Sequence, residues 1–352
     1  MGGPGPRRPS DRTTPPGYIG GLSTALQNAV DTPLMPPPDW LKRCPQCQSS
    51  CSALLALCCY SWGSTEDPRF CHTMLNMYRK RPLSERLIRA ISFRSLPGGT
   101  VESLIRKGAD VNGPHDTLMP LHSACMVCDG DCVELLLEHG ANVNALDGYQ
   151  RTALHYAAEK DETCVEILLE YGADPNAPDG NQDSPLHWAA FKNMDGCVLA
   201  LLEGGAKANA RDYNQDTPLS WAVMKGNLES VRLLLEYGAQ PDTANLKGQY
   251  PAGRLAILMG RGLGGEREEE CLELLHRACG TLRLRREGGI PPEAARDAQL
   301  HQRLLTLCSV PGTLKALARR AVRGSLGDRQ LSQVVIELPI PKSIQDYVLL
   351  LH

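Results

Sequence analysis

Residues 152–177 read TALHYAAEKDETCVEILLEYGADPNA, and the same frame recurs twice downstream. It reads SPLHWAAFKNMDGCVLALLEGGAKANA from residue 184 and TPLSWAVMKGNLESVRLLLEYGAQPDT from residue 217. The leucines at one place in this frame are 33, 32 and 33 residues apart: Leu121, Leu154, Leu186 and Leu219. The Gly-Ala pairs step by 32, 32, 33 and 33 residues and begin at Gly108, Gly140, Gly172, Gly205 and Gly238. Two features that keep one period indicate a repeat array.

The period of about 33 residues and the pattern T-P-L-H-x-A resemble the ankyrin repeat. This resemblance implies helix pairs joined by hairpin fingers, so we expect an all-α ankyrin-repeat solenoid. A degenerate repeat precedes residue 117, and a decayed one near 248–280 has Ala252 and Gly253 in place of Leu and His. Both can cap the array, because terminal repeats face solvent on one side. The clear repeats run over about 117–149, 150–181, 182–214 and 215–247.

Several recurring polar and aromatic positions have a structural interpretation. Thr152 is placed to cap a first helix, and His155 can hydrogen-bond the turn of the next repeat. The histidine position recurs at His122 and His187, and the fourth repeat carries Ser220, which would ruin a shared metal site. We therefore interpret the histidines as turn residues rather than catalytic bases or metal ligands. The next position holds Tyr156, Trp188 and Trp221, which either pack between repeats or form an exposed aromatic ladder.

An ankyrin stack offers finger tips and first helices as a concave surface, whose residues are free of packing constraints. We expect a protein client to be bound there, with an inert solvated surface as the alternative for each position. The candidate client-binding residues are Tyr149, Gln150, Lys160, Asp161, Asn181, Gln182, Lys192, Asn193, Tyr213, Asn214 and Lys225.

The charge balance limits the classes of ligand. Residues 84–250 carry 13 basic and 24 acidic side chains, a net charge of −11, within a chain of net charge −3. An acidic array repels polyanions, so we expect no nucleic-acid ligand. No apolar run reaches the roughly 18–20 residues of a membrane span, so we expect no membrane insertion. Unpaired thiols at core positions of the repeats, such as Cys164 and Cys197, fit a reducing compartment, and we expect a cytoplasmic protein.

The first 80 residues differ from the rest. Residues 1–40 are rich in Gly, Pro, Ser and Thr, and we expect residues 1–80 to form a disordered, Cys-containing extension. Cys44 and Cys47, followed by Cys71 and His72, could be written as a zinc site, but a second pair at the usual distance is missing. We expect neither a metal nor a cofactor, and zinc in residues 44–72 stays the alternative.

After the repeats, which we place at 83–285, a helical linker is expected over 286–308. Residues 313–322 then predict a short helix with an apolar stripe and with Arg319, Arg320 and Arg323 on its other faces. The alternating prolines predict an extended Leu338–Pro341 segment that presents Ile340 as a fixed knob. A segment of this size cannot build an adequate core alone, so we expect it to dock on another protein.

Residues 309–352 resemble a SOCS box, the C-terminal module that recruits ubiquitin ligase machinery. In the family pattern (S/T)-L-x-x-x-C-x-x-x-(A/V), Thr313 and Leu314 match, Ala318 stands where Cys is usual, and Val322 fits the last slot. The resemblance implies that this helix binds elongin C through Thr313, Leu314, Leu317, Ala318 and Val322. The family's L-P-Φ-P segment, which favours cullin-5, corresponds to Leu338, Pro339, Ile340 and Pro341.

Ankyrin repeats followed by a SOCS box resemble the ankyrin repeat and SOCS box family, over about residues 82–352. This resemblance implies a non-catalytic substrate receptor of a ubiquitin ligase made of elongins B and C, cullin-5 and a RING subunit. No catalytic residues are expected, since no Ser-His-Asp pairing, P-loop or HExxH occurs at a distinctive spacing. The alternative is a plain ankyrin scaffold that sequesters or localises its partner, and the Ala318 departure favours it.

Overall fold

The computed structural model describes residues 82–93, 100–115, 117–309, 318–319, 321–323, 325 and 331–349. These residues form helices and turns with two isolated bridges, and no strand occurs among them. The all-α solenoid expected from the sequence is confirmed. The predicted N-terminal extension and its cysteines lie outside the described residues.

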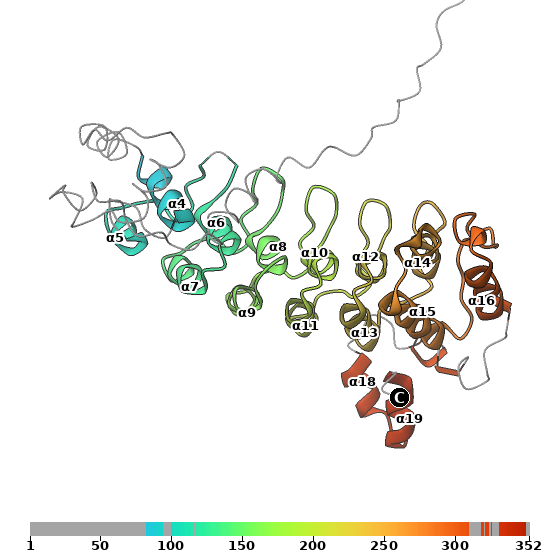
Figure 1. The fold of residues 1–352 in the computed structure, drawn as a ribbon. Helices are drawn as coiled ribbons and strands as arrows, with labels where there is room; N and C mark the ends of the chain where they lie inside the picture. Colours follow the sequence, from blue (N-terminus) through green and yellow to red (C-terminus); the bar gives the residue numbers. More distant parts are fainter. Residues whose placement is uncertain are drawn as a thin grey trace, which may run out of the picture. The chain divides into compact units, whose positions relative to one another are not determined.

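Two rows of helices build the array (Figure 1). The first-helix row consists of α6 (Pro120–Met126), α8 (Ala153–Ala158), α10 (Pro185–Lys192), α12 (Pro218–Lys225) and α14 (Pro251–Leu258). The second-helix row consists of α7 (Gly130–Glu138), α9 (Glu162–Glu170), α11 (Asp195–Glu203), α13 (Leu228–Glu236) and α15 (Glu266–Cys279). Each helix packs against its neighbours in the same row and against its own partner, and the fingers project from the first-helix row (Figure 1).

The core runs continuously between the two rows. Leu154, Leu186 and Leu219 on the first helices are completely buried, as the repeated leucine position predicts. Cys164 and Cys197 are buried free thiols on the second helices, where a small apolar side chain fits. The glycines after the second helices have positive φ, between +82° and +92°, a conformation that other residues rarely adopt. Local chemistry therefore fixes where each helix of the array ends.

Helices at both ends complete the stack. The degenerate first repeat is the pair α4 (Leu83–Phe93) and α5 (Val101–Arg106), and α4 packs on α6. In the decayed last repeat, α14 leads through a π-helical turn, Met259–Leu263, to α15. Gly253 replaces histidine there for a steric reason, because a Cβ atom would lie 1.9 Å from the carbonyl oxygen of Leu284. The final cover is a 3₁₀ turn, Ala294–Arg296, followed by α16 (Ala298–Ser309).

The end of the chain forms a small satellite core. Helix α18 (Leu331–Glu337) packs on α19 (Lys342–Leu349), and Val335, Val348 and Leu349 are buried between them. The expectation of an extended Leu338–Pro341 segment is wrong. The amide of Ile340 donates to the carbonyl oxygen of Leu338 at 2.7 Å, a tight turn centred on Pro339, and Ile340 is only half-exposed.

Candidate protein-binding surfaces

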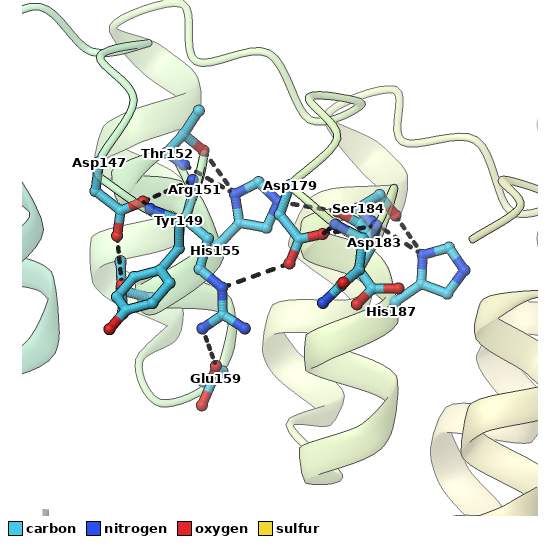
Figure 2. A network of polar contacts seen from close by, with 12 residues as sticks. Asp147, Tyr149, Arg151, Thr152, His155, Glu159, Asp179, Asp183, Ser184 and His187 are labelled. Carbon is cyan, nitrogen blue, oxygen red and sulfur yellow. Dashed lines mark hydrogen bonds and ion pairs between the residues drawn. The ribbon is translucent and has the colours of Figure 1, made fainter. Parts of the chain in front are cut away.

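The histidines of the first helices lock each repeat to the next (Figure 2). The Nδ1 atom of His155 accepts a hydrogen bond from the amide of Thr152 at 3.1 Å, so its Nε2 atom donates to the carbonyl oxygen of Asp183, also at 3.1 Å. His187 repeats the arrangement with Ser184 and the carbonyl oxygen of Asp216. The interpretation as turn histidines is confirmed for His155 and His187, since both ring nitrogens of each are occupied within the fold. His122 makes the contact to the next repeat through Nε2, 3.0 Å from the carbonyl oxygen of Arg151, while its Nδ1 has no partner among the described residues.

Burial determines the charge of these histidines. Desolvation lowers the pKa of His155 and of His187 to about 4 each, although hydrogen bonds and nearby carboxylates act in the opposite direction. Both rings are therefore neutral at pH 7, as the hydrogen-bond pattern requires. A neutral, enclosed imidazole holds the finger in place and is not exposed to a substrate.

Two of the fingers are tied by an aspartate to the first helix that follows them. Asp147 accepts hydrogen bonds through Oδ1 from the amides of Tyr149 and Arg151, at 2.7 and 2.8 Å, which shapes the finger tip (Figure 2). Its other oxygen accepts from the hydroxyl of Tyr156 at 2.6 Å. In the finger before α12, Asp212 accepts in the same way from Nε1 of Trp221 at 3.2 Å. The aromatic position thus anchors the finger base to the helix.

The finger before α10 uses a different anchor. The second oxygen of Asp179 lies 3.4 Å from Nε of Arg151, which comes from the preceding finger. The same guanidinium lies 3.5 Å from Glu159 and stacks 4.1 Å from the ring centre of Trp188 (Figure 2 shows the two ion pairs). Nε1 of Trp188 consequently has no hydrogen-bond partner among the described residues. Arg151 takes the place that the ring donor occupies in the other two repeats.

Three aromatic rings form a cluster on α10 and α12. Trp188, Phe191 and Trp221 meet edge to face, with ring centres 5.5 to 6.3 Å apart, and all three are half-buried. Tyr156 is buried, at 8% exposure. The packing interpretation of this position holds for all three repeats, and two of its members keep part of their surface exposed.

The predicted client residues fall into two groups. The finger-tip members Tyr149 and Tyr213 are exposed, at 57% and 74%, and neighbouring fingers are joined by backbone hydrogen bonds such as that from the amide of Tyr213 to the carbonyl oxygen of Asn181. The members at the far end of the first helices are partly committed to the fold. Asp161 caps α9 through the amide of Cys164, and Asn193 ends α10 in a left-handed conformation. Their roles in client binding stay predictions.

The remaining candidates have the following places. Gln150 and Gln182 adopt positive φ at the finger tips, and Asn181 and Asn214 are exposed beside them. Lys160, Lys192 and Lys225 lie at or just after the C-terminal ends of α8, α10 and α12. Sequence reasoning missed Phe191, which directly precedes Lys192. The repeat pattern gives no expectation of an aromatic side chain at this position.

The SOCS-box candidates are only partly within the described residues. Thr313, Leu314 and Leu317 lie outside them, while Ala318 is exposed and Val322 packs partly against the satellite core. In the proline segment, Pro339 and Pro341 are exposed and Leu338 is half-buried. The roles of these residues in partner binding also stay predictions.

Two arginines of this segment are buried rather than solvated. Arg319 donates to the carbonyl oxygen of Arg277 in α15 at 3.0 Å and stacks 3.5 Å from the ring centre of Tyr347. Arg323 donates to the carbonyl oxygens of Leu235 and Val348. Burial lowers the pKa of Arg323 to about 10, which leaves it charged at pH 7. Arg319 and Arg323 thus pack against the array and against α19.

Comparison with known proteins agrees with this architecture. A model of ankyrin repeats in three copies matches residues 87–179 and 176–245, and a model of many ankyrin repeats matches 219–276. A SOCS box model matches residues 310–349. Ankyrin repeat and SOCS box protein 8 of Homo sapiens is 69% identical over 282 residues, which cover 80% of this chain and 98% of that protein. The Mus musculus protein of the same name is 68% identical over the same shares.

The chain belongs to the ankyrin repeat and SOCS box protein family. This is a family of substrate adaptors of E3 ubiquitin ligases, which are generally non-catalytic receptors. In such adaptors the SOCS box in general interacts with elongin B/C and a cullin. In the described part of this family member, no helix is long and apolar enough to cross a membrane, and no cluster of three His, Cys, Asp or Glu side chains could hold a metal ion. The zinc alternative in residues 44–72 lies outside that part.

Proposed function

We propose that this chain is the substrate-receptor subunit of a ligase containing elongins B and C, cullin-5 and a RING subunit. The ankyrin surface holds a protein client, and the SOCS box docks the ligase, which leads to ubiquitination and proteasomal degradation of the client. The observation that carries the proposal is the presence, in one chain, of a complete ankyrin array and a SOCS box with Leu338-Pro339-Ile340-Pro341. The buried free thiols of the repeats support a cytoplasmic site of action.

The chain acts by proximity rather than by chemistry. Holding a client near the ubiquitin-conjugating enzyme raises the effective concentration of client lysines around the transferred ubiquitin. Elongin C is bound by Leu314 as the main anchor, with Thr313, Leu317, Ala318 and Val322 around it. Cullin-5 is selected by the proline segment, where Pro339 and Pro341 are accessible.

Co-purification of the full chain with its partners tests this function. Leu314→Asp is expected to abolish recovery of elongins B and C, because it places a charge in an apolar contact. Ser309→Asp, at an exposed position at the end of α16, is the matched control and should leave recovery unchanged. Replacement of both Pro339 and Pro341 by alanine should keep the elongins and lose cullin-5. Unchanged recovery of elongins with Leu314→Asp would refute the assignment.

The second candidate is an ankyrin scaffold that holds its partner without ubiquitination. It is favoured by Ala318, which stands where the family pattern has Cys and offers a smaller contact. This candidate predicts that client levels do not respond to deletion of Leu338 and Pro339. The ligase function predicts that the client accumulates on the same deletion.

A further inference from the structure

Among the paired helices of the array, the acidic side chains lie on the second-helix row. Helices α7, α9, α11 and α13 of the second-helix row carry ten acidic side chains and one basic one. Helices α6, α8, α10 and α12 of the first-helix row carry no acidic side chain and two basic ones, Lys192 and Lys225. The next pair continues the division, with Arg254 on α14 and five acidic against two basic side chains on α15. The net charge of the region therefore misrepresents its first-helix face.

Lysines recur along this face at one place in the repeat. Lys160, Lys192 and Lys225 each stand eight residues after the N-cap of their helix. Lys192 pairs with Glu159 at 3.3 Å, and its side chain keeps 42% exposure. Lys160 and Lys225 are exposed and form no ion pair among the described residues, and Nζ of Lys160 donates to the carbonyl oxygen of Met126 at 2.9 Å. A ladder of three cations thus lies on a face whose helices lack acidic side chains.

The carboxylates near this face are already used by the fold, including Glu159, which pairs with both Lys192 and Arg151. Asp147, Asp179 and Asp212 at the finger bases are buried, with exposures of 8%, 3% and 3%, and they accept the hydrogen bonds described above. Arg254 forms an ion pair with Asp216, so it adds little to the accessible positive charge. The accessible charge of the face is the lysine ladder.

Apolar surface adjoins the ladder. The Nζ atom of Lys225 lies 4.3 Å from the ring centre of Phe191, within the half-buried cluster that Phe191 forms with Trp188 and Trp221. A cation beside an aromatic surface suits a ligand that combines carboxylates with an apolar side chain. A protein segment rich in Asp and Glu with an intervening Leu, Phe or Trp has this chemistry.

We propose that the first-helix row binds an acidic segment of the protein client, with carboxylates on Lys160, Lys192 and Lys225 and one apolar side chain on the Trp188–Phe191–Trp221 cluster. The identity of the ligand as a client rests on the function proposed above. The binding chemistry rests only on the charges and aromatic rings of the first-helix row. A long nucleic acid is excluded as the occupant because three lysines offer few phosphate contacts, and the acidic second-helix row repels a polyanion that extends past them.

Peptide binding to the purified full chain tests the proposal. The probe is a pool of short fluorescent peptides rich in Asp and Glu, each with one Leu, Phe or Trp. The control pool has the same peptides with Asn in place of Asp and Gln in place of Glu. We expect the acidic pool to bind, and to bind more weakly at about 200 mM than at about 50 mM salt. The triple variant Lys160→Glu, Lys192→Glu, Lys225→Glu should weaken binding about tenfold or more. Phe191→Ala should weaken the binding of the acidic peptides without changing how that binding depends on salt.

The control triple variant makes the same change in net charge away from the face. Lys207, Arg232 and Arg267 are exposed, two of them on the second-helix row, and their replacement by Glu should change binding little. Equal loss in both triple variants, no binding of the acidic pool, or equal binding of a single-stranded oligonucleotide would overturn the proposal. Recovery of elongins reports separately on the ligase function, because the lysine variants leave it intact and Leu314→Asp leaves peptide binding intact.

Discussion

Arg323 donates one hydrogen bond to the carbonyl oxygen of Leu235 and a second, at 2.9 Å, to that of Val348. Leu235 lies in the last turn of α13, and Val348 lies in the last turn of α19. Helix C-termini present free carbonyl lone pairs and a partial negative charge, so both ends attract a guanidinium. The carbonyl oxygen of Leu235 also accepts from the amide of Gly238 at 3.2 Å, and Arg323 adds a second donor there. One side chain therefore connects the array to the C-terminal segment.

Replacement of Arg323 by leucine is expected to loosen the segment that follows it. The variant leaves the carbonyl of Val348 without its buried donor, at a cost of about 1–3 kcal/mol to the local opening free energy. Hydrogen exchange of the amides in α19 should become faster, while those of α8 to α11 keep their protection. Arg323→Lys, which retains the charge but not the fork of donors, should fall between the two. Equal exchange rates of the α19 amides in the unmodified chain and in both variants would contradict the role assigned to Arg323.

The aromatic position allows a matched comparison between repeats. Trp221→Phe removes the ring donor to Asp212, whereas Trp188→Phe removes a donor that has no partner in the described residues. Both lose a similar apolar contact, so their difference reports the hydrogen bond. We expect Trp221→Phe to lower the free energy of unfolding by about 1–3 kcal/mol more than Trp188→Phe, because it strands a buried carboxylate oxygen. Denaturant unfolding measures the free energy of both variants. Equal losses of stability would count against the hydrogen bond from Trp221 to Asp212 as an anchor.

Most of the array could be predicted from the sequence pattern because its helices and turns are set by local contacts that repeat. The cap at Thr152, the buried Leu154 and the left-handed Gly172 are each set by residues a few positions away, so the sequence sufficed to place them. The contact of Arg151 with Trp188 and the fit of Gly253 against Leu284 join residues over 30 positions apart. The repeat period of the sequence does not predict individual contacts of this kind.

The C-terminal segment shows a second limit of sequence reasoning. The sequence places Arg319 and Arg323 off the predicted apolar stripe, and arginine on such a face is usually solvated. Their burial depends on the carbonyl groups of Arg277 and Leu235, which belong to helices far away in the sequence. The charge division between the two rows was hidden for a related reason, since a regional sum adds helices that face in different directions.

The neutral histidines predict a loss of stability in acid. The folded-state pKa values of His155 and His187, about 4, lie below the unfolded value of 6.5, so their contribution is complete above pH 6.5 and is lost as the pH falls toward 4. Each ring should contribute a slope of about 1.4 kcal/mol per pH unit in this window. His187→Ser copies the fourth repeat, where Ser220 fills the position, and should flatten the slope while lowering stability at pH 7. An unchanged slope in urea titrations between pH 6.5 and 4 would rule this out.

Asp183 should show the opposite dependence. Burial, with the charges of Asp179 and Asp212 added, raises the pKa of Asp183 from 3.8 to about 7. The folded state then holds a proton that the unfolded state has released, so this group destabilises the fold increasingly as the pH rises from 4 to 7. Asp183→Asn is expected to raise the free energy of unfolding at pH 8 by about 1–3 kcal/mol. The control Glu166→Gln, at an exposed position of α9, should have no such effect; a gain of the same size there would point to net charge instead.

Ala318 provides the sharpest test of how the chain engages a ligase. The side chain is exposed, and the SOCS-box pattern that the segment resembles has Cys there. Under the proposed function, Ala318→Cys restores a buried sulfur contact of about 1–2 kcal/mol, so elongin C should bind about five- to thirtyfold more tightly. Ala318→Ser has nearly the same size but a polar atom, and it should give no gain because burying a hydroxyl offsets the contact. Equal affinities of the Cys and Ser variants in calorimetry would mean that this position lies outside the elongin interface.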